Sequence, residues 1–135
     1  MQPNEVFLSH SSDDRAMAER IADCLRRHGI PTFYSPLNLL GAQQWQNEIL
    51  NALMRCDWFL VLLSPAAIDS MWVKRETAFA LNDLRYENRI VPLMFRPSNL
   101  GPLEWLRLFQ FVDFQAGFDD ACRALLRTWG IGLQL

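Results

Sequence analysis

The sequence feature that most constrains the fold is Trp58–Leu63, a run of six apolar residues followed directly by Ser64 and Pro65. A strand that faces solvent on one side alternates apolar and polar residues, whereas a strand covered on both sides is apolar throughout. Pro65 ends the run, because proline has no N–H to give to a sheet ladder. The run therefore predicts a strand inside a parallel sheet with helices on both faces.

Short apolar segments and stretches of helical periodicity alternate along the chain. The expected strands are Val6–Leu8, Ile30–Tyr34, Trp58–Leu63, Ile90–Phe95 and Phe109–Phe114. Helical spacing of apolar residues predicts four helices, which contain Met17–Leu25, Trp45–Cys56, Met71–Leu84 and Ala121–Trp129. This alternation predicts an α/β fold, and five strands fit the flavodoxin-like open parallel sheet of order 2-1-3-4-5 with helices on both faces.

Capping residues and prolines refine these boundaries. Ser11 with Asp14 matches a capping box at the start of the first helix, and Ser70 and Asp119 are placed to cap the third and fourth helices. Pro92 lacks an N–H, so the strand that contains it is expected near an edge of the sheet or at a bulge.

Composition limits the domain count and the compartment. With 135 residues, of which 50% are hydrophobic, the chain fits a single domain over residues 1–135. Residues 131–135 follow the last helix without an element of their own and could begin a linker to a further domain. The three cysteines show no C-x-x-C spacing, which predicts neither a disulfide framework nor a zinc site and favours a reducing, cytoplasmic setting.

Charge and hydropathy argue against two classes of partner. The formal net charge is −2 and no block of like charges occurs, so direct nucleic-acid binding is not expected. No apolar run approaches the ~20 residues of a membrane span, and Met1–Glu5 is too polar for a signal peptide. We therefore expect no membrane partner.

The chain lacks the residues that the common ligands of this fold require. A phospho-receiver needs an aspartate after the third strand, where this chain has Ser64. An FMN phosphate loop after the first strand would meet the carboxylates of Asp13 and Asp14. Neither a G-x-G-x-x-G loop nor a Walker A loop occurs, and the two histidines, His10 and His28, give no basis for a hydrolase triad.

One crevice of this fold does carry candidate residues. In a doubly wound sheet, ligands bind beyond the carboxyl ends of the strands where the strand order reverses, here between the first and third strands. Ser9–Ser12 follows the first strand, and the W-x-x-x-E sequence of Trp72 and Glu76 lies in the helix after the third. These two residues are one turn apart beside the core stripe. The ordinary alternative is a tryptophan at the core edge and a surface glutamate near Lys74 or Arg75.

Several segments together carry a family resemblance: Val6–Ser11 with Asp13, Gly41–Ile49, Ala52–Leu53, Cys56–Asp57, Leu60–Pro65, and Ser70–Glu76 with Ala80–Leu81. In this order and spacing the chain resembles a TIR (Toll/interleukin receptor) domain over nearly all of its length. The resemblance implies the five-stranded fold described above. It also implies that the loop Ser35–Gln44 takes part in assembly and in gating a pocket.

The resemblance implies an activity as well. Many TIR domains, among them bacterial, plant and axon-degeneration members, cleave NAD+ between nicotinamide and ribose with a glutamate in a similar W-x-x-x-E motif. Glu76 would then be catalytic, with NAD+ as substrate and with no cofactor and no metal. Trp72 would pack on the nicotinamide or the ribose. Ser9, His10 and Ser11 would line the crevice.

By the same resemblance, Leu39, Gly41 and Trp45 would lie in or beside the loop that closes the crevice. Trp45 also fits the core stripe of its helix, and the sequence favours the core position. His10 is equally well explained as a plain loop residue. Some NAD-cleaving members carry a basic residue just after the first strand, which this chain lacks. Arg15 or an arginine from a neighbouring copy is the candidate to neutralise the phosphates.

Two functions remain open at this point. The first is an NAD+ nucleosidase activated by TIR self-assembly, which releases nicotinamide and ADP-ribose or a cyclic form in immune or antiviral defence. The second is a non-catalytic module that signals through TIR–TIR assembly, as animal receptor adaptors do. Those adaptors typically lack a usable glutamate at this position, so Glu76 with Trp72 favours the enzyme. A sensor domain, fused or associated, is the further partner that the resemblance suggests.

Overall fold

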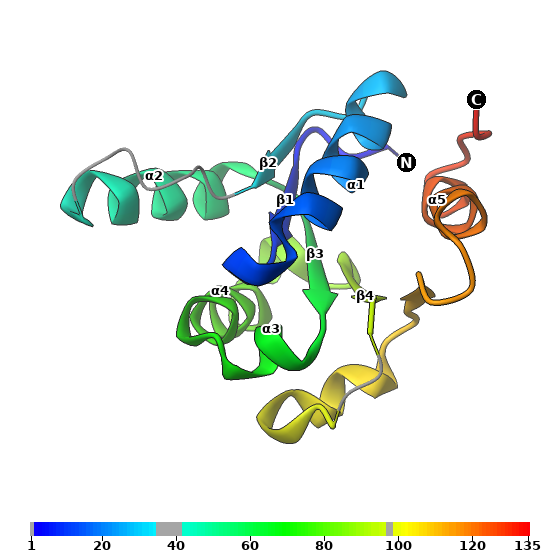
Figure 1. Cartoon of the computed structure of the whole chain (residues 1–135). Coiled ribbons are helices and arrows are strands. Elements are labelled where there is room, and N and C mark those ends of the chain that lie inside the picture. Colours follow the sequence, from blue (N-terminus) through cyan, green and yellow to red (C-terminus); the bar gives the residue numbers. More distant parts are fainter. Residues whose placement is uncertain (1, 35–41, 97–98) are drawn as a thin grey trace.

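A five-stranded parallel sheet forms the centre of the molecule (Figure 1). The computed structural model describes residues 2–34, 42–96 and 99–135, with the backbone alone described for 42–44, 102 and 105. The strand order is β2-β1-β3-β4-β5, which confirms the predicted flavodoxin-like topology. The strands are β1 (Val6–Ser9), β2 (Thr32–Tyr34), β3 (Trp58–Leu63), β4 (Ile90–Met94) and β5 (Val112–Asp113).

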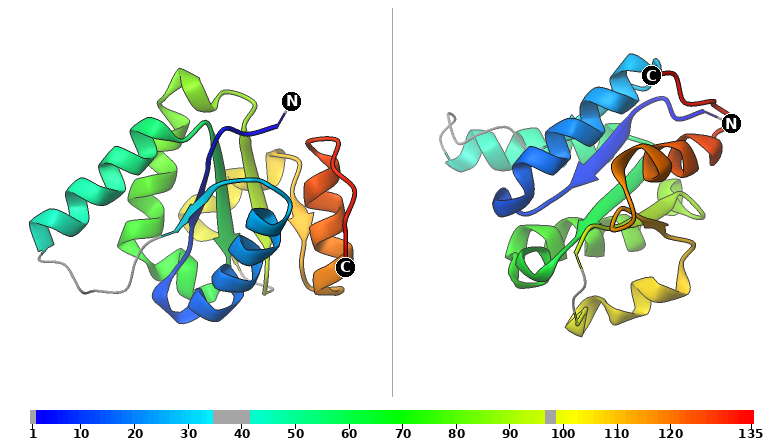
Figure 2. Two further views of the ribbon diagram at one scale, coloured as in Figure 1. Left: turned by 90° about the horizontal axis from the view of Figure 1, so that it is seen from above. Right: turned by 45° about the vertical axis from the view of Figure 1, so that its right-hand side comes forward.

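Helices cover both faces of this sheet, as the apolar β3 run predicts. The α-helices are α1 (Arg15–Arg27), α2 (Ala42–Arg55), α3 (Pro65–Asp69), α4 (Met71–Leu81) and α5 (Phe118–Arg127). The described residues also form the 3-10 helices η1 (Ser12–Asp14), η2 (Leu84–Tyr86) and η3 (Gly101–Leu108). Figure 2 (right) shows α1 and α5 above the strands and α4 with η3 below them.

Alternation along β3 divides the core into two clusters. Leu60 and Leu62 point to the side of α1 and α5, whereas Phe59, Val61 and Leu63 point to the side of α2 and α4. Successive side chains of a strand face opposite sides, so a strand between two helical layers needs apolar residues at every position. No helix in the described ranges combines the length and the apolar character that crossing a bilayer requires.

Several predicted elements are shorter than expected. Strand β2 begins at Thr32 rather than at Ile30, and β4 ends at Met94 rather than at Phe95. The fifth strand covers Val112–Asp113 rather than Phe109–Phe114, because the Phe109 N–H bonds back to Leu106 and η3 delays the return to the sheet. Helix α4 ends at Leu81 rather than at Leu84. Asp83 begins η2 by accepting a hydrogen bond from the Arg85 N–H, and Leu84 is 86% exposed rather than on the core face.

The caps are partly as predicted. Ser70 caps α4 by accepting from the Val73 N–H, which confirms that prediction. The capping box at the first helix is wrong: Ser11 caps η1 instead, and the Asp14 carboxylate accepts a hydrogen bond from the Ser64 hydroxyl. Asp119 lies in the first turn of α5 and does not cap it, since the N-cap position is a glycine.

Pro92 lies in β4, which is next to the edge strand β5, in agreement with its expected place near the sheet edge. Strand β4 pairs with β3 on one side and β5 on the other. The β4–β5 ladder begins at Leu93, one residue past Pro92. The missing N–H therefore costs no ladder hydrogen bond, because β5 is too short to reach it.

Candidate active site at the carboxyl edge of the sheet

Ser9 and Glu76 form a buried hydrogen-bonded pair at the carboxyl edge of the sheet. Ser9 is the last residue of β1, and Glu76 lies in the second turn of α4. The Ser9 hydroxyl donates to Glu76 Oε1 over 2.7 Å. Val73 and Ala80 pack α4 against the core, which directs Glu76 to the end of β1. The predicted crevice and the predicted carboxylate therefore meet.

Burial dominates the electrostatics of Glu76. The residue is 5% exposed and Ser9 is 1% exposed, so Glu76 lies within the core rather than beside it as expected. Burial raises the pKa of Glu76 to about 7, while the hydrogen bond from Ser9 lowers it by stabilising the ionised form. A carboxyl group with this pKa is partly ionised at neutral pH, and shifts of this size concentrate at functional sites.

Glu76 borders a groove between α2 and α4. The groove has a volume of about 310 Å³. Its lining is mainly apolar with few polar groups, as is usual for small-molecule sites. Helix α2 contributes Gln46, Ile49, Leu50 and Leu53, and α4 contributes Trp72, Arg75, Glu76 and Phe79.

Trp72, which lines this groove, contacts a second tryptophan. The rings of Trp45 and Trp72 lie edge to face, with centroids 4.2 Å apart and an interplanar angle of 85°. The guanidinium of Arg75 lies 5.5 Å from the centroid of the Trp72 ring. Trp45 packs against the core cluster of the α2 side, in agreement with the core position that its periodicity favours. Trp72 is half-buried and lines the groove itself.

His10 presents an unused acceptor beside Ser9. The residue is 8% exposed, and its Nδ1 lies 2.7 Å from the carbonyl oxygen of Ser11. A carbonyl only accepts, so Nδ1 carries the proton and Nε2 bears a lone pair. Within the described part of the chain, Nε2 is buried without a partner. Burial also lowers the pKa of His10, which keeps the ring neutral near pH 7.

A family model of the TIR domain matches residues 6–126. The chain belongs to the TIR domain family. A curated relative, the Stimulator of interferon genes protein of Magallana gigas, is 23% identical over 134 residues. The match covers 92% of this chain but only 32% of that relative, so the TIR domain described here spans about a third of its length.

Solved structures share the fold at low sequence identity. The TIR domains of the activated Roq1 resistosome match with a TM-score of 0.68 and 16% identity, covering 93% of this chain and 99% of that one. The TIR domain heterodimer of RPS4 and RRS1 gives 0.65 and 14%, covering 92% and 94%. The CMP N-glycosidase BcmB of Clostridium botulinum gives 0.56 and 16%, covering 92% and 97%. These similarities establish the TIR fold.

Of the other predicted site residues, one has a role in the local fold and two lie outside the described part of the chain. Ser11 is buried, and its hydroxyl accepts from the Asp13 N–H, so it shapes the loop after β1 rather than reaching Glu76. Leu39 and Gly41 lie outside the described residues. Phe79 lines the groove although the sequence did not single it out as a site residue, and its place on the stripe of Trp72 was the signal.

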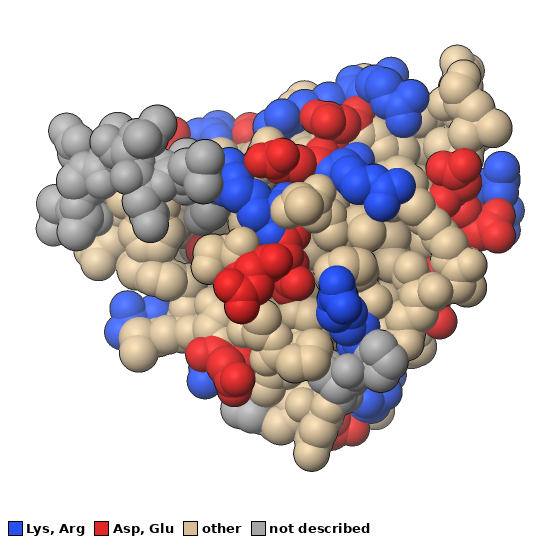
Figure 3. Space-filling model, in the orientation of Figure 1, with Lys and Arg blue, Asp and Glu red and all other residues tan. Residues whose placement is uncertain are grey.

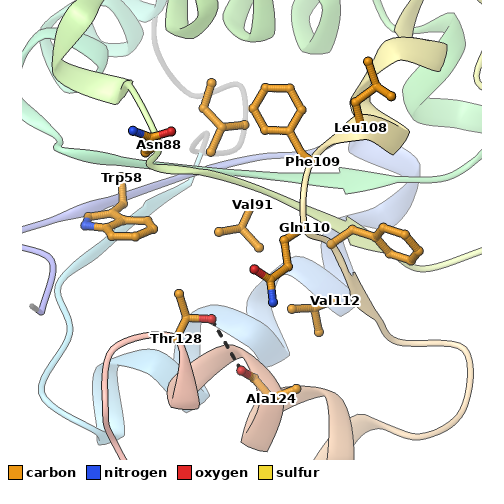
Figure 4. A pocket seen from close by; sticks show the side chains of 11 residues that line it. Trp58, Asn88, Val91, Leu108, Phe109, Gln110, Val112, Ala124 and Thr128 are labelled. Carbon is orange, nitrogen blue, oxygen red and sulfur yellow. Dashed lines mark hydrogen bonds between the residues drawn. The ribbon is translucent and has the colours of Figure 1, made fainter.

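A larger cavity of about 540 Å³ lies elsewhere in this TIR domain (Figure 4). It is lined by β4, the chain from Leu108 to Val112, and the α5 side, with Trp58, Gln110 and Thr128 among its walls. Trp58 begins β3, so this cavity sits toward the amino end of the sheet. Its described lining residues include no carboxylate, histidine or cysteine, in contrast to the groove that Glu76 borders.

Proposed function

We propose that this TIR domain is an NAD+ nucleosidase that cleaves the bond between nicotinamide and ribose, with Glu76 as its catalytic residue. The observation that carries the proposal is the buried Glu76 carboxyl group, oriented by Ser9 at the carboxyl edge of the sheet and bordering a groove. The raised pKa of Glu76 does not come from a structural ion pair, because burial and the Ser9 hydrogen bond are the causes that act on it.

The chemistry requires one carboxylate. Ordinary glycosidases use two, because one must protonate a poor leaving group. Nicotinamide is cationic in NAD+ and leaves as a neutral molecule, so no general acid is needed. As the bond breaks, positive charge develops on the ribose ring. The ionised Glu76 stabilises this oxocarbenium-like charge where it grows, and water or a second nucleophile then takes the anomeric carbon.

Substrate binding favours the reactive form of Glu76. The cationic nicotinamide ribosyl group, placed near this carboxyl, lowers its pKa from about 7 because an adjacent positive charge stabilises the carboxylate. Ser9 acts as a positioning residue, since it holds Oε1 and leaves the second oxygen to the substrate. The orphan His10 Nε2 accepts a hydrogen bond from a substrate hydroxyl or carboxamide. Trp72 supplies an aromatic wall to the groove.

The size of the groove explains why an assembly would be needed. At about 310 Å³ it falls at the lower end of the roughly 300–1,000 Å³ of small-molecule sites. This space accepts the nicotinamide riboside half and leaves the adenosine half outside. Arg15, the sequence candidate for the phosphates, pairs with Glu19 at 3.1 Å, whereas Arg75 lines the groove. A neighbouring TIR copy would provide the remaining surface.

The relatives support the two parts of this proposal separately. An enzyme that is named for breaking an N-glycosidic bond shares the fold. TIR domains pair with each other in the RPS4 and RRS1 heterodimer and belong to the Roq1 resistosome. The Magallana gigas relative is named for interferon signalling and is longer than this chain. We therefore place the activity in immune signalling, with a sensor domain, fused or associated, that triggers TIR assembly.

The second candidate function is a non-catalytic module that signals by TIR–TIR assembly. One experiment separates the two: nicotinamide release from NAD+ is measured with the domain dilute and with the domain crowded on beads. Glu76→Gln removes the catalytic charge, and Glu87→Gln is the matched control because Glu87 is exposed. The enzyme requires release by the crowded native and Glu87→Gln proteins. Self-association without release would favour the scaffold.

The surface charge fits a small anionic substrate better than a polyanion. Acidic and basic side chains are interspersed over the face shown in Figure 3, without a broad patch of either sign. The formal net charge of the chain is −2. A dinucleotide held by a few specific contacts is compatible with this surface, because it does not depend on a continuous basic field.

A further inference from the structure

Arg75 is the only cation among the described residues that line the groove beside Glu76. The two residues are neighbours on α4, but they differ in depth, because Glu76 is 5% exposed whereas Arg75 lies at the surface. The remaining lining residues from α2 and α4 carry no charge. The groove therefore combines one buried acidic group with one exposed basic group.

The guanidinium of Arg75 is held by an aromatic ring rather than by an acid. It lies over the Trp72 ring at 5.5 Å from the centroid, which is within the range of a cation–π contact. Such a contact limits the motion of the side chain but pairs none of its N–H donors with an oxygen. Within the described ranges, the ion pairs with aspartate or glutamate are formed by other arginines: Arg15, Arg55, Arg85, Arg89, Arg107 and Arg123.

The two opposite charges at the groove do not neutralise each other. Burial and the hydrogen bond from Ser9 are the causes that act on the pKa of Glu76, and Arg75 is not among them. A guanidinium in contact with the carboxylate would lower that pKa. The groove therefore presents its negative group and its positive group as two separate contacts for a ligand.

We propose that Arg75 binds a phosphate group of the substrate and makes the site selective for phosphorylated nicotinamide ribosides over the unphosphorylated riboside. This inference rests on the proposed function, because it assigns the cationic nicotinamide ribosyl end of the substrate to Glu76. The anionic end of the same molecule then meets the guanidinium, whose planar fork matches the oxygens of a phosphate. A substrate with a cation at one end and an anion at the other is complementary to the two charges of the groove.

The size of the groove agrees with this assignment. Its volume of about 310 Å³ accepts the nicotinamide riboside half, and the phosphate on that ribose is the next group along the substrate. Arg75 lines the groove and is exposed, so its side chain can reach a group at the opening. Arg15, the candidate from the sequence, pairs with Glu19 at 3.1 Å and is not among the described lining residues. Only the adenosine half is then left to a neighbouring copy.

Binding to a protein without the catalytic carboxylate tests this role. The Glu76→Gln domain, crowded on beads, is incubated with nicotinamide mononucleotide or with nicotinamide riboside, which differ by one phosphate group. Depletion of ligand from the supernatant gives Kd. The mononucleotide should bind at least about tenfold more tightly than the riboside. Adding Arg75→Gln should abolish this ratio by weakening the mononucleotide alone. Arg75→Lys should keep part of the ratio, because it retains the charge without the planar fork.

Lys74→Gln is the matched control for the loss of a positive charge. Lys74 precedes Arg75 on the same helix and is not among the described lining residues of the groove. Adding Lys74→Gln to the Glu76→Gln domain should leave the ratio of the two Kd values unchanged. A ratio near one with Arg75 present would overturn the proposal. An equal loss of both ligands in Arg75→Gln, or the same loss of the mononucleotide in Lys74→Gln, would overturn it as well.

Failure of this inference can be distinguished from failure of the proposed function. If the native domain releases nicotinamide from NAD+ while the Kd ratio is near one, the nucleosidase stands and the role of Arg75 is rejected. If the ratio depends on Arg75 while the crowded native domain releases no nicotinamide, the phosphate contact stands and the nucleosidase is rejected.

Discussion

The Ser9 hydroxyl at the end of β1 donates a 2.7 Å hydrogen bond to the Glu76 carboxyl group on α4. This contact joins the loop after the first strand to the W-x-x-x-E helix, and it occurs in the interior, where both residues are buried. A buried acid of this kind costs stability in its ionised form. An acid that costs stability and yet borders a groove is expected to serve chemistry rather than folding.

Activity should rise with pH through about 7. Burial raises the pKa of Glu76 to about 7, and only the ionised form stabilises an oxocarbenium-like transition state. In a pH series of kcat/KM for nicotinamide release, the acid limb reports this group in the free enzyme. A kcat/KM that stays constant from about pH 5.5 to 8.5 would show that a group with this pKa is not required.

Ser9→Ala should move this acid limb to higher pH. The Ser9 hydroxyl stabilises the ionised carboxylate, so its removal leaves burial unopposed and raises the pKa of Glu76 further. At neutral pH the variant should lose activity, and at high pH it should regain part of it. Ser12→Ala is the control, because Ser12 follows three residues later in the chain and is exposed. An unchanged pH profile in Ser9→Ala would contradict the positioning role.

Glu76→Gln should stabilise the protein at alkaline pH. The pKa is raised on folding, so the stability linked to this group is fully present below the unfolded value of 4.5 and is lost as pH rises through about 7. At about 1.4 kcal/mol per pKa unit, the shift from 4.5 to about 7 corresponds to about 3 kcal/mol. Urea unfolding of both proteins at pH 5 and pH 8 measures it. Equal stability differences at the two pH values would show that folding does not raise the pKa of Glu76.

Ser70→Ala should lower the free energy of unfolding by about 1 kcal/mol and also reduce activity. The Ser70 hydroxyl accepts from the Val73 N–H and sets where α4 starts, and α4 carries both Trp72 and Glu76. Ser70→Asp retains a capping oxygen and should restore both properties. Thermal unfolding and nicotinamide release are measured on the same samples. Lost stability with full activity would show that the helix start does not position the site.

Trp72→Ala should raise KM more than it lowers kcat. The ring forms a wall of the groove, so we expect it to contribute to substrate binding more than to the reacting bond. Trp72→Phe keeps an aromatic face and should retain most of the binding. Trp45 meets Trp72 edge to face and packs against the core, so Trp45→Ala should mainly reduce stability. Steady-state kinetics and thermal unfolding are measured for the three variants. A larger rise in KM for Trp45→Ala than for Trp72→Ala would contradict this prediction.

The fold was readable from the sequence because its signals are local. The unbroken apolar run of β3 and the alternation with helices specify a sheet covered on both faces, and that topology places Ser9 near the α4 helix. Helical spacing gives the direction of a side chain but not its depth, so the burial of Glu76 within the core was not foreseen.

The parts that were missed depend on distant contacts. The Asp14 carboxylate bonds the Ser64 hydroxyl instead of capping its own helix, and nothing near Asp14 in the sequence indicates that partner. Cys24 and Cys122 have no motif spacing, yet α1 and α5 place both of them in one core cluster. The fifth strand is shorter than predicted, because the sequence after Leu108 is compatible both with a strand and with the turn that it forms.

The central claim is tested most directly by the rate at which Glu76→Gln releases nicotinamide from NAD+, compared with the rate of the native domain when both are crowded on beads at pH 8. Removal of a carboxylate that stabilises a developing charge should reduce kcat by at least about 10²–10³-fold, with assembly unchanged. Glu87→Gln should match the native rate. A Glu76→Gln protein that assembles and releases nicotinamide at the native rate would contradict the account.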